Sequence, residues 1–256
     1  MILEKELWTD ASITFLSSDI VEYDMKEAGF SIIRENRLLN SETIKELAEL
    51  PNKDIRHRKI GLLERGNRSL RQGMSNGFKQ YRLWFGEANG LKDEDILSIK
   101  KDAIFVKKFC DNTEYGDYVK FAQKHVYYAF MQFTSNAGKF EFYLGSDSFD
   151  VKGLHDNNVV LHENGMIPVI KRVMSLLSQY DELGAKRYVV RVMNDYKKYK
   201  VPVEYYREFN SVSGYRLLQN DEEHVVREVG ESYKTNLIID YNYVNVLVPL
   251  LNIVMG

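Results

Sequence analysis

The chain has 256 residues and a formal net charge of −2, and 44% of its residues are hydrophobic, so it can bury a sizeable core in one large domain or two interlocked ones. This balance excludes a polycationic nucleic-acid binder but leaves local basic patches open, and the single cysteine, Cys110, excludes a disulfide framework and a cysteine-based zinc site. No stretch reaches the roughly 18 apolar residues of a membrane span, and charges interrupt the N-terminal residues where a signal peptide has its apolar core. We therefore expect a soluble protein of the reducing cytoplasm with no membrane partner.

The N-terminal residues predict a strand followed by helices. Residues 12–23 mix β-branched and aromatic residues with polar ones, as strands do, and residues 26–39 have apolar side chains at helical spacing. A further helix is expected to begin at Asn40 or Ser41, because either side chain can cap it and a glutamate lies in its first turn.

The rest of the chain alternates helical and strand-like segments. Residues 53–89 are basic and rich in helix formers, with a turn expected at 65–67. Beyond them the pattern predicts two short strands at 96–99 and 103–106 and a group of β-hairpins at 118–152. Two amphipathic helices are expected within 164–200, and the tail at 237–255 has strand or short-helix character. Separated groups of strands with helices between them predict an α+β fold.

Two aspartates stand where buried strands should still be running. Asp24 directly follows a β-branched run, and Asp102 lies between two apolar runs. An ionised carboxylate in apolar surroundings costs several kcal/mol unless it is paired or binds a metal. Two such acids on neighbouring strands can hold a pair of Mg²⁺ ions, which stabilise both the attacking and the leaving oxygen of a phosphoryl transfer. From these residues alone the plainer interpretation stays open, namely strand-end acids that reach solvent or pair with Lys100 and Lys101.

The sequence around these aspartates resembles motifs of the family B DNA polymerases. The stretch DMKEAGFS, from Asp24 to Ser31, is similar to the first polymerase motif of that family, D-x-x-S-L-Y-P-S. The stretch KKDAIFV resembles the third motif, Y-x-D-T-D-S-[IV]-F-V, with Asp102 at the second, metal-binding aspartate. Later segments are similar, in the family's order, to its lysine-rich strand, its K-G segment, the passage into the thumb and the closing segment with Pro249 in register. The resemblance covers nearly the whole chain.

The resemblance implies a right-hand polymerase-like palm, an antiparallel sheet with packed helices, joined to reduced helical fingers and a small thumb. It places the palm-like core at 1–39 and 78–160, the fingers at 40–77 and the thumb-like region at 161–256. The implied activity is template-directed nucleotidyl transfer, as in a minimal family B DNA polymerase. The implied partners are primer–template nucleic acid and nucleoside triphosphates, and a second protein could supply missing modules.

The resemblance also implies a set of site residues. Asp24 and Asp102 would be catalytic and, with the main-chain carbonyl of Met25, would bind two Mg²⁺ ions. Nucleotide would lie against Gly29, which stands where the family has a tyrosine that excludes ribonucleotides, and against the finger cations Arg65, Arg68, Arg71, Lys79 and Arg82. Nucleic acid would contact Lys120, Lys124, Lys152 and Gly153.

The finger cations also have an interpretation that needs no ligand. Arg65/Arg68 and Lys79/Arg82 are i,i+3 pairs, and such a pair shares one face of a helix, as triphosphate binding requires. A solvated basic helix surface is the commoner outcome for residues of this kind.

Lys100, the missing second motif and the reduced fingers favour a different function. Lys100 replaces the first aspartate of the third motif, although Glu22 or Asp19 could compensate, and the second motif has no clean counterpart. Only 18 residues precede Asp19, so we expect no exonuclease domain and no proofreading. The alternative is a catalytically degenerate polymerase-like protein that acts as a nucleic-acid- or protein-binding subunit. A third interpretation is an unrelated α+β protein, in which Asp24 and Asp102 would lie far apart.

Overall fold

The computed structural model describes residues 2–155, 159, 160, 162–207, 209 and 241–256. It shows an α+β protein with antiparallel strand pairs, as the sequence predicts. The chain divides into two compact units: unit 1 comprises residues 1–11 and 19–126, and unit 2 comprises residues 12–18 and 127–256. Two strands, β2 (Phe15–Met25) and β6 (Val119–Ser135), contribute residues to both units.

Unit 1 contains strands in the order β1-β3-β4-β2-β6. The register places Trp8 of β1 opposite Ile99 of β3, and Tyr23 of β2 opposite Ile104 of β4. The remaining strands of this unit are β1 (Leu7–Thr9), β3 (Ile96–Lys100), β4 (Ala103–Val106) and β5 (Glu114–Tyr115), which pairs with the start of β6. The two short strands expected at 96–106 are thus confirmed.

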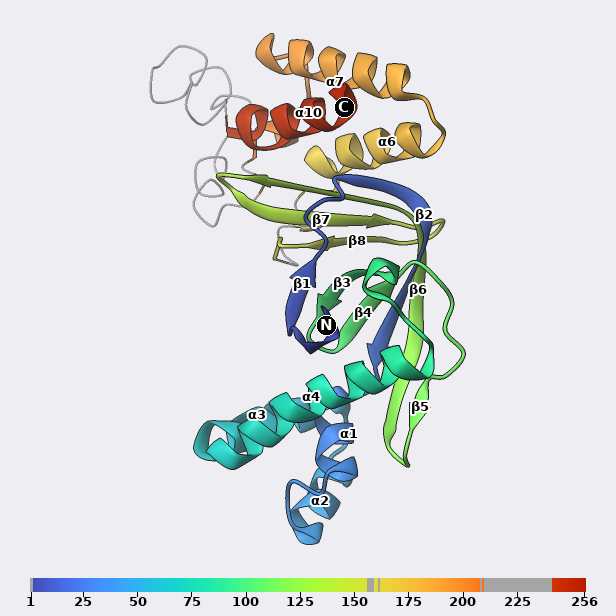
Figure 1. The fold of residues 1–256 in the computed structure, drawn as a ribbon. Helices are drawn as coiled ribbons and strands as arrows, with labels where there is room; N and C mark the ends of the chain where they lie inside the picture. The colour runs from blue at the N-terminus through green and yellow to red at the C-terminus, as the bar shows by residue number, and fades with distance from the viewer. Residues whose placement is uncertain (1, 156–158, 161, 208, 210–240) are drawn as a thin grey trace. The chain divides into compact units, whose positions relative to one another are not determined.

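The helices of unit 1 pack together and bury one face of these strands (Figure 1). They are α1 (Ala28–Glu35), α2 (Ser41–Ala48), α3 (Lys53–Gly66) and α4 (Arg68–Ala88), with short 3₁₀ turns at Ile2–Glu4 and Asp93–Asp95. Alternation along β2 turns Val21, Tyr23 and Met25 toward this core, where they join Phe78 and Phe85 of α4.

Asparagine caps set where three of these helices begin. The Oδ1 atoms of Asn40, Asn52 and Asn67 accept the main-chain N–H of the residue three positions on, at 2.8 to 3.0 Å. Such a cap satisfies one of the N–H groups that a helix start leaves unpaired. The cap expected at residue 40 or 41 is therefore Asn40.

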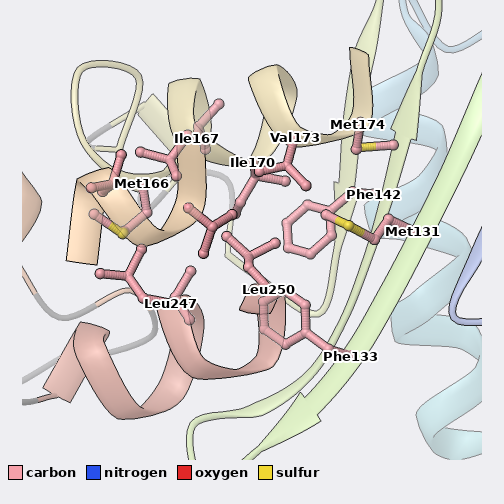
Figure 2. Packing of buried hydrophobic residues seen from close by; sticks show 14 of the residues in the cluster. Met131, Phe133, Phe142, Met166, Ile167, Ile170, Val173, Met174, Leu247 and Leu250 are labelled. Carbon is pink, nitrogen blue, oxygen red and sulfur yellow. The ribbon is translucent and has the colours of Figure 1, made fainter. Parts of the chain in front are cut away.

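Unit 2 combines β6 with β7 (Gly138–Leu144) and β8 (Phe149–Lys152) in antiparallel order. Figure 2 shows Met131, Phe133 and Phe142 of this sheet meeting side chains of the helices that cover it, such as Ile170 and Leu250. The helical segments of the unit are α6 (Met166–Ser178), α7 (Glu182–Lys197), the 3₁₀ turn Val203–Tyr206, the π-helical turn Tyr243–Leu247 and α10 (Val248–Met255). The expected hairpins and the two amphipathic helices are confirmed, and the described part of the tail is helix.

The two units do not follow the boundaries of the three expected modules. Helix α4 runs without interruption across the expected boundary between residues 77 and 78. The expected thumb-like region, 161–256, lies in unit 2 with the β7–β8 hairpin, and its residues 161, 208 and 210–240 are outside the described part. Among the described helices, none is long and apolar enough to cross a membrane.

Candidate metal site at the β3–β4 turn

The end of β2 and the turn between β3 and β4 are joined by their main chains. Asp24 lies opposite Ala103 in the β2–β4 register, and the N–H of Met25 donates to the carbonyl oxygen of Asp102 at 3.0 Å. Asp24 and Asp102 are consequently neighbours, although 78 positions separate them in the sequence.

The surroundings of Asp24 are unfavourable to its negative charge. Burial raises the pKa of the Asp24 carboxyl most, and the charges of Asp102 and Glu22 raise it further, whereas Lys124 and Lys53 act in the opposite direction. Like charges close together in a partly desolvated place favour the protonated form of one of them. A bound cation would remove this penalty, because it supplies the positive charge that the chain only partly provides.

Glu22 brings a third carboxylate to the same face of β2. It precedes Asp24 by two residues, so both side chains point away from the face that packs under the helices. Glu22 is only 1% exposed, and the Nζ of Lys124 lies 3.4 Å from its carboxylate. Of the two acids expected to compensate for the missing aspartate, Glu22 is therefore the one beside Asp24, whereas Asp19 is exposed to solvent.

The turn that carries Asp102 has a strained backbone. Lys101 has a φ of 58°, and the N–H of Asp102 donates to the carbonyl of Lys100 at 2.7 Å, which closes a three-residue γ-turn. A residue with a side chain in this left-handed region costs on the order of 1–3 kcal/mol and persists only when its surroundings hold it there. Here the N–H of Lys101 donates to the carbonyl of Glu6 at 2.7 Å, and the carbonyl of Lys101 accepts from the Arg82 guanidinium at 2.5 Å.

Lys100 is the last residue of β3 and directly precedes the strained turn. It lies opposite Ala103, and its Nζ donates to the hydroxyl of Thr9 on β1 at 2.9 Å. One hydrogen bond of its ammonium group is thus directed to β1.

A pocket of about 420 Å³ adjoins the strained turn on the helical side of unit 1. Arg68, Arg71 and Lys101 give it positive charge, and Arg68 forms no ion pair with any residue that the structure describes. The Lys101 ammonium lies 4.9 Å from the centre of the Phe78 ring. The other lining residues are Glu6, Glu64, Gln72, Met74 and Ser75, of which Ser75 donates to Glu6 at 2.9 Å. Lys101, which lines the pocket, directly precedes Asp102, whereas Asp24 and Glu22 point to the face of β2 opposite the helices.

The family model of the Bacteriophage PBS1 gene 130 protein matches residues 1–256, the whole of both units. The chain belongs to this family. No curated protein matches it.

The first three finger cations, Arg65, Arg68 and Arg71, come from two helices. Arg68 and Arg71 line the pocket, but Arg65 belongs to α3 and Arg68 to α4, because Asn67 ends one helix and caps the next. The expectation that Arg65 and Arg68 share a helix face is therefore wrong. Arg71 also donates to the carbonyl oxygens of Glu64 and Arg65 at 3.1 and 3.3 Å, so it caps the end of α3.

The second expected pair, Lys79 and Arg82, also fails to form a shared cationic face. Both lie on α4, but Lys79 is exposed and pairs with Glu4 at 2.8 Å, whereas Arg82 is fully buried. Gly29 lies in α1, and a Cβ atom at this position would be 3.3 Å from the side chain of Met74 on α4. The small size of Gly29 thus serves helix packing whatever else it does.

The four residues expected to contact nucleic acid fall in both units. In unit 1, Lys120 pairs with Glu114, and Lys124 pairs with Glu22. In unit 2, Lys152 and Gly153 lie at the end of β8, where Lys152 opposes Glu141.

Gly153 has a backbone reason to be glycine. Its φ is +93°, and a Cβ atom would lie 2.1 Å from the carbonyl oxygen of Lys139. No other residue type fits this position without a shift of the main chain.

Sequence reasoning missed the left-handed backbone of Lys101 and the burial of Arg82. The signal for Arg82 is present in the sequence, because Phe78 and Phe85 lie four positions before it and three after it, which puts all three on one side of α4. No comparable signal marks Lys101, since a lysine gives no indication of a left-handed backbone.

Proposed function

We propose that the chain is a metal-dependent nucleotidyltransferase resembling a minimal family B DNA polymerase, with the strands and helices of unit 1 as its palm. The observation that carries the proposal is the hydrogen-bonded joint between β2 and the β3–β4 turn, which makes Asp24 and Asp102 neighbours. The helices of unit 1 pack on one face of β2 while Glu22 and Asp24 point to the other, which leaves the acidic side away from the helical layer.

The donor atoms at this place suit a hard divalent cation. Asp24 and Asp102 offer carboxylate oxygens, which Mg²⁺ prefers, and the raised pKa of Asp24 indicates that its negative charge is only partly compensated by the chain. The resemblance adds the carbonyl of Met25 as a further ligand. When bound, two Mg²⁺ ions would stabilise the charge on the attacking and leaving oxygens.

The proposed reaction joins a primer 3′-hydroxyl to a nucleoside triphosphate. A bond forms between the 3′-oxygen and the α-phosphorus, and the bond from this phosphorus to the bridging oxygen of the β-phosphate breaks. Pyrophosphate leaves with that electron pair, and the hydroxyl proton passes to water. The chain's own part would be to align the phosphates with positive charge, and the candidates for this role are the pocket cations Arg68, Arg71 and Lys101, of which Lys101 directly precedes Asp102 in the sequence.

The choice of nucleotide follows from Gly29. The residue has no side chain with which to exclude a ribose 2′-hydroxyl, so we propose that both deoxyribonucleotides and ribonucleotides are accepted. Primer–template would contact Lys120 and Lys124, each of which would then exchange a carboxylate partner for a phosphate.

Primer extension by the full chain tests the proposal. Primed DNA and RNA templates are incubated with deoxyribonucleotides or ribonucleotides and with Mg²⁺ or Mn²⁺. We expect extension by the wild type and a loss of at least about 100-fold in Asp24→Asn and in Asp102→Asn, because each removes a charged group that acts on the reacting phosphate. Asp19→Asn is the matched control, since Asp19 is an exposed acid on the same strand.

Two outcomes would overturn the proposal. One is the absence of extension by the wild type on every template, and the other is full activity of both site variants. If extension is absent but nucleic acid binds with a steep salt dependence, the degenerate binding subunit becomes the better function.

A further inference from the structure

Arg82 is a charged side chain in a place where charge is costly. It is 0% exposed and lies among the aromatic residues with which α4 packs on the sheet of unit 1. Burial lowers the pKa of Arg82, and the nearby charges of Glu6 and Asp102 partly offset this effect. A buried guanidinium is retained against several kcal/mol of desolvation only when its contacts repay the cost.

The contacts of Arg82 are directed at the main chain. Its Nε donates to the carbonyl of Leu3 at 3.1 Å, and its Nη1 donates to the carbonyl of Lys101 at 2.5 Å. Its Nη2 has no hydrogen-bond partner among the described residues. The planar fork of arginine reaches two carbonyl groups at once, which a lysine ammonium or a neutral side chain does not do in the same geometry.

We infer that Arg82 is a positioning residue for the proposed metal site: it holds the left-handed Lys101 turn in place and thereby keeps the Asp102 carboxylate beside Asp24. This inference rests on the proposed function. The turn stores backbone strain, and the Arg82 bond to the Lys101 carbonyl is one of the few contacts that hold it. Without this bond the turn relaxes, and Asp102 moves relative to Asp24, whose position is set by β2.

The test measures Mn²⁺ binding by the full chain, because Mn²⁺ is paramagnetic and can be counted directly by its spectrum. We expect Arg82→Met to fold but to bind Mn²⁺ at least about tenfold more weakly, as do other losses of residues that orient metal ligands. Arg82→Lys keeps the charge and one donor, so it should recover part of the affinity. A purely structural arginine would instead lower stability without changing the affinity of the folded protein.

Two variants of α4 serve as matched controls. Lys79→Met removes a positive charge one turn earlier on the same helix, and Phe85→Leu loosens the packing of the helix without removing a contact to the turn. Both should bind Mn²⁺ as tightly as the wild type at a temperature where they are folded. A tenfold loss in either control would overturn the inference.

The outcomes separate this inference from the proposed function. If the wild type binds no Mn²⁺, the proposed site fails and the inference with it. If the wild type binds Mn²⁺ and folded Arg82→Met binds it equally well, the inference fails while the site stands. Should Arg82→Met not fold, Arg82→Lys decides, because an affinity equal to that of the wild type would contradict a positioning role.

Discussion

The N–H of Met25 donates to the carbonyl oxygen of Asp102 at 3.0 Å, so the last residue of β2 is tied directly to the β3–β4 turn. The proximity of Asp24 and Asp102 is therefore fixed by main-chain hydrogen bonds and not by their own side chains. Substitutions of the two carboxylates by amides should leave the backbone of the site intact.

Asp24→Asn should make the protein more stable at neutral pH. Because the folded state raises the pKa of Asp24, the native protein holds its proton at pH values where the unfolded chain has lost it. The contribution of Asp24 to stability accordingly falls as the pH rises from the unfolded pKa, about 3.9, through the folded one. The gain of the variant should appear at pH 7 and vanish at pH values below the unfolded pKa.

Denaturant unfolding with a chelator present measures this difference, and Asp19→Asn should show no comparable gain. If Asp24→Asn is less stable than the wild type at pH 7, the expected cost of the Asp24 charge is contradicted. Added Mn²⁺ should raise the unfolding midpoint of the wild type but not that of Asp24→Asn.

At position 101 glycine should give a more stable protein than alanine, which is the reverse of their order within a helix. Lys101 has a left-handed backbone, so Lys101→Gly should be more stable than Lys101→Ala by about 1 kcal/mol. Lys79 is exposed in the middle of α4, and there the alanine variant should be more stable than the glycine variant by about 1 kcal/mol. Free energies of unfolding for the four variants test the turn geometry, and equal values at position 101 would contradict it.

Gly153→Ala should cost at least about 2 kcal/mol, because a Cβ atom would meet the carbonyl oxygen of Lys139 and the backbone is left-handed. Gly61→Ala is the control. Gly61 lies in α3 with no atom within 4 Å of the added carbon, so the variant should be more stable than the wild type by about 1 kcal/mol. Thermal unfolding distinguishes the two. If Gly153→Ala keeps wild-type stability but loses nucleic-acid binding, Gly153 is there for a ligand and not for the backbone.

The Cys110 thiol should react slowly in the native state. It is buried, and burial raises its pKa to about 11, so little thiolate exists at pH 8. The Tyr23 hydroxyl accepts the N–H of Cys110 at 2.7 Å, and its loss in Tyr23→Phe should cost about 1 kcal/mol and speed labelling. Timed alkylation, with the unfolded chain as reference, measures both effects. Rapid labelling of the native wild type would contradict this burial.

The sequence predicts local structure better than it predicts the site. Asn40 indicates the start of its helix because its side chain can cap and a glutamate, Glu42, follows in the first turn. The turn expected at 65–67 likewise lies where α3 ends. The pairing of Arg65 with Arg68 failed because that same signal separates two helices. Local patterns predict where helices begin and end, because a cap or a turn depends on residues that are close in the sequence.

The parts of the site that sequence reasoning missed depend on tertiary contacts. Nothing local makes Lys101 left-handed; the carbonyl of Glu6 and the Arg82 guanidinium, both distant in sequence, hold it there. Arg82 itself was expected on the surface, where most arginines lie, although its spacing from Phe78 and Phe85 indicated the buried side of α4.

The short N-terminal segment 12–18 belongs to unit 2 although the chain on both sides of it belongs to unit 1. It carries the carbonyl groups of Ile13 and Thr14, which accept from the side chain and the main chain of Gln132 at 2.6 and 2.9 Å. During synthesis the residues of unit 1 are complete once residue 126 has emerged, whereas this segment must wait for strands made later. A gene cut at residue 127 would therefore not yield two independent halves, because the second would lack a piece encoded near the start.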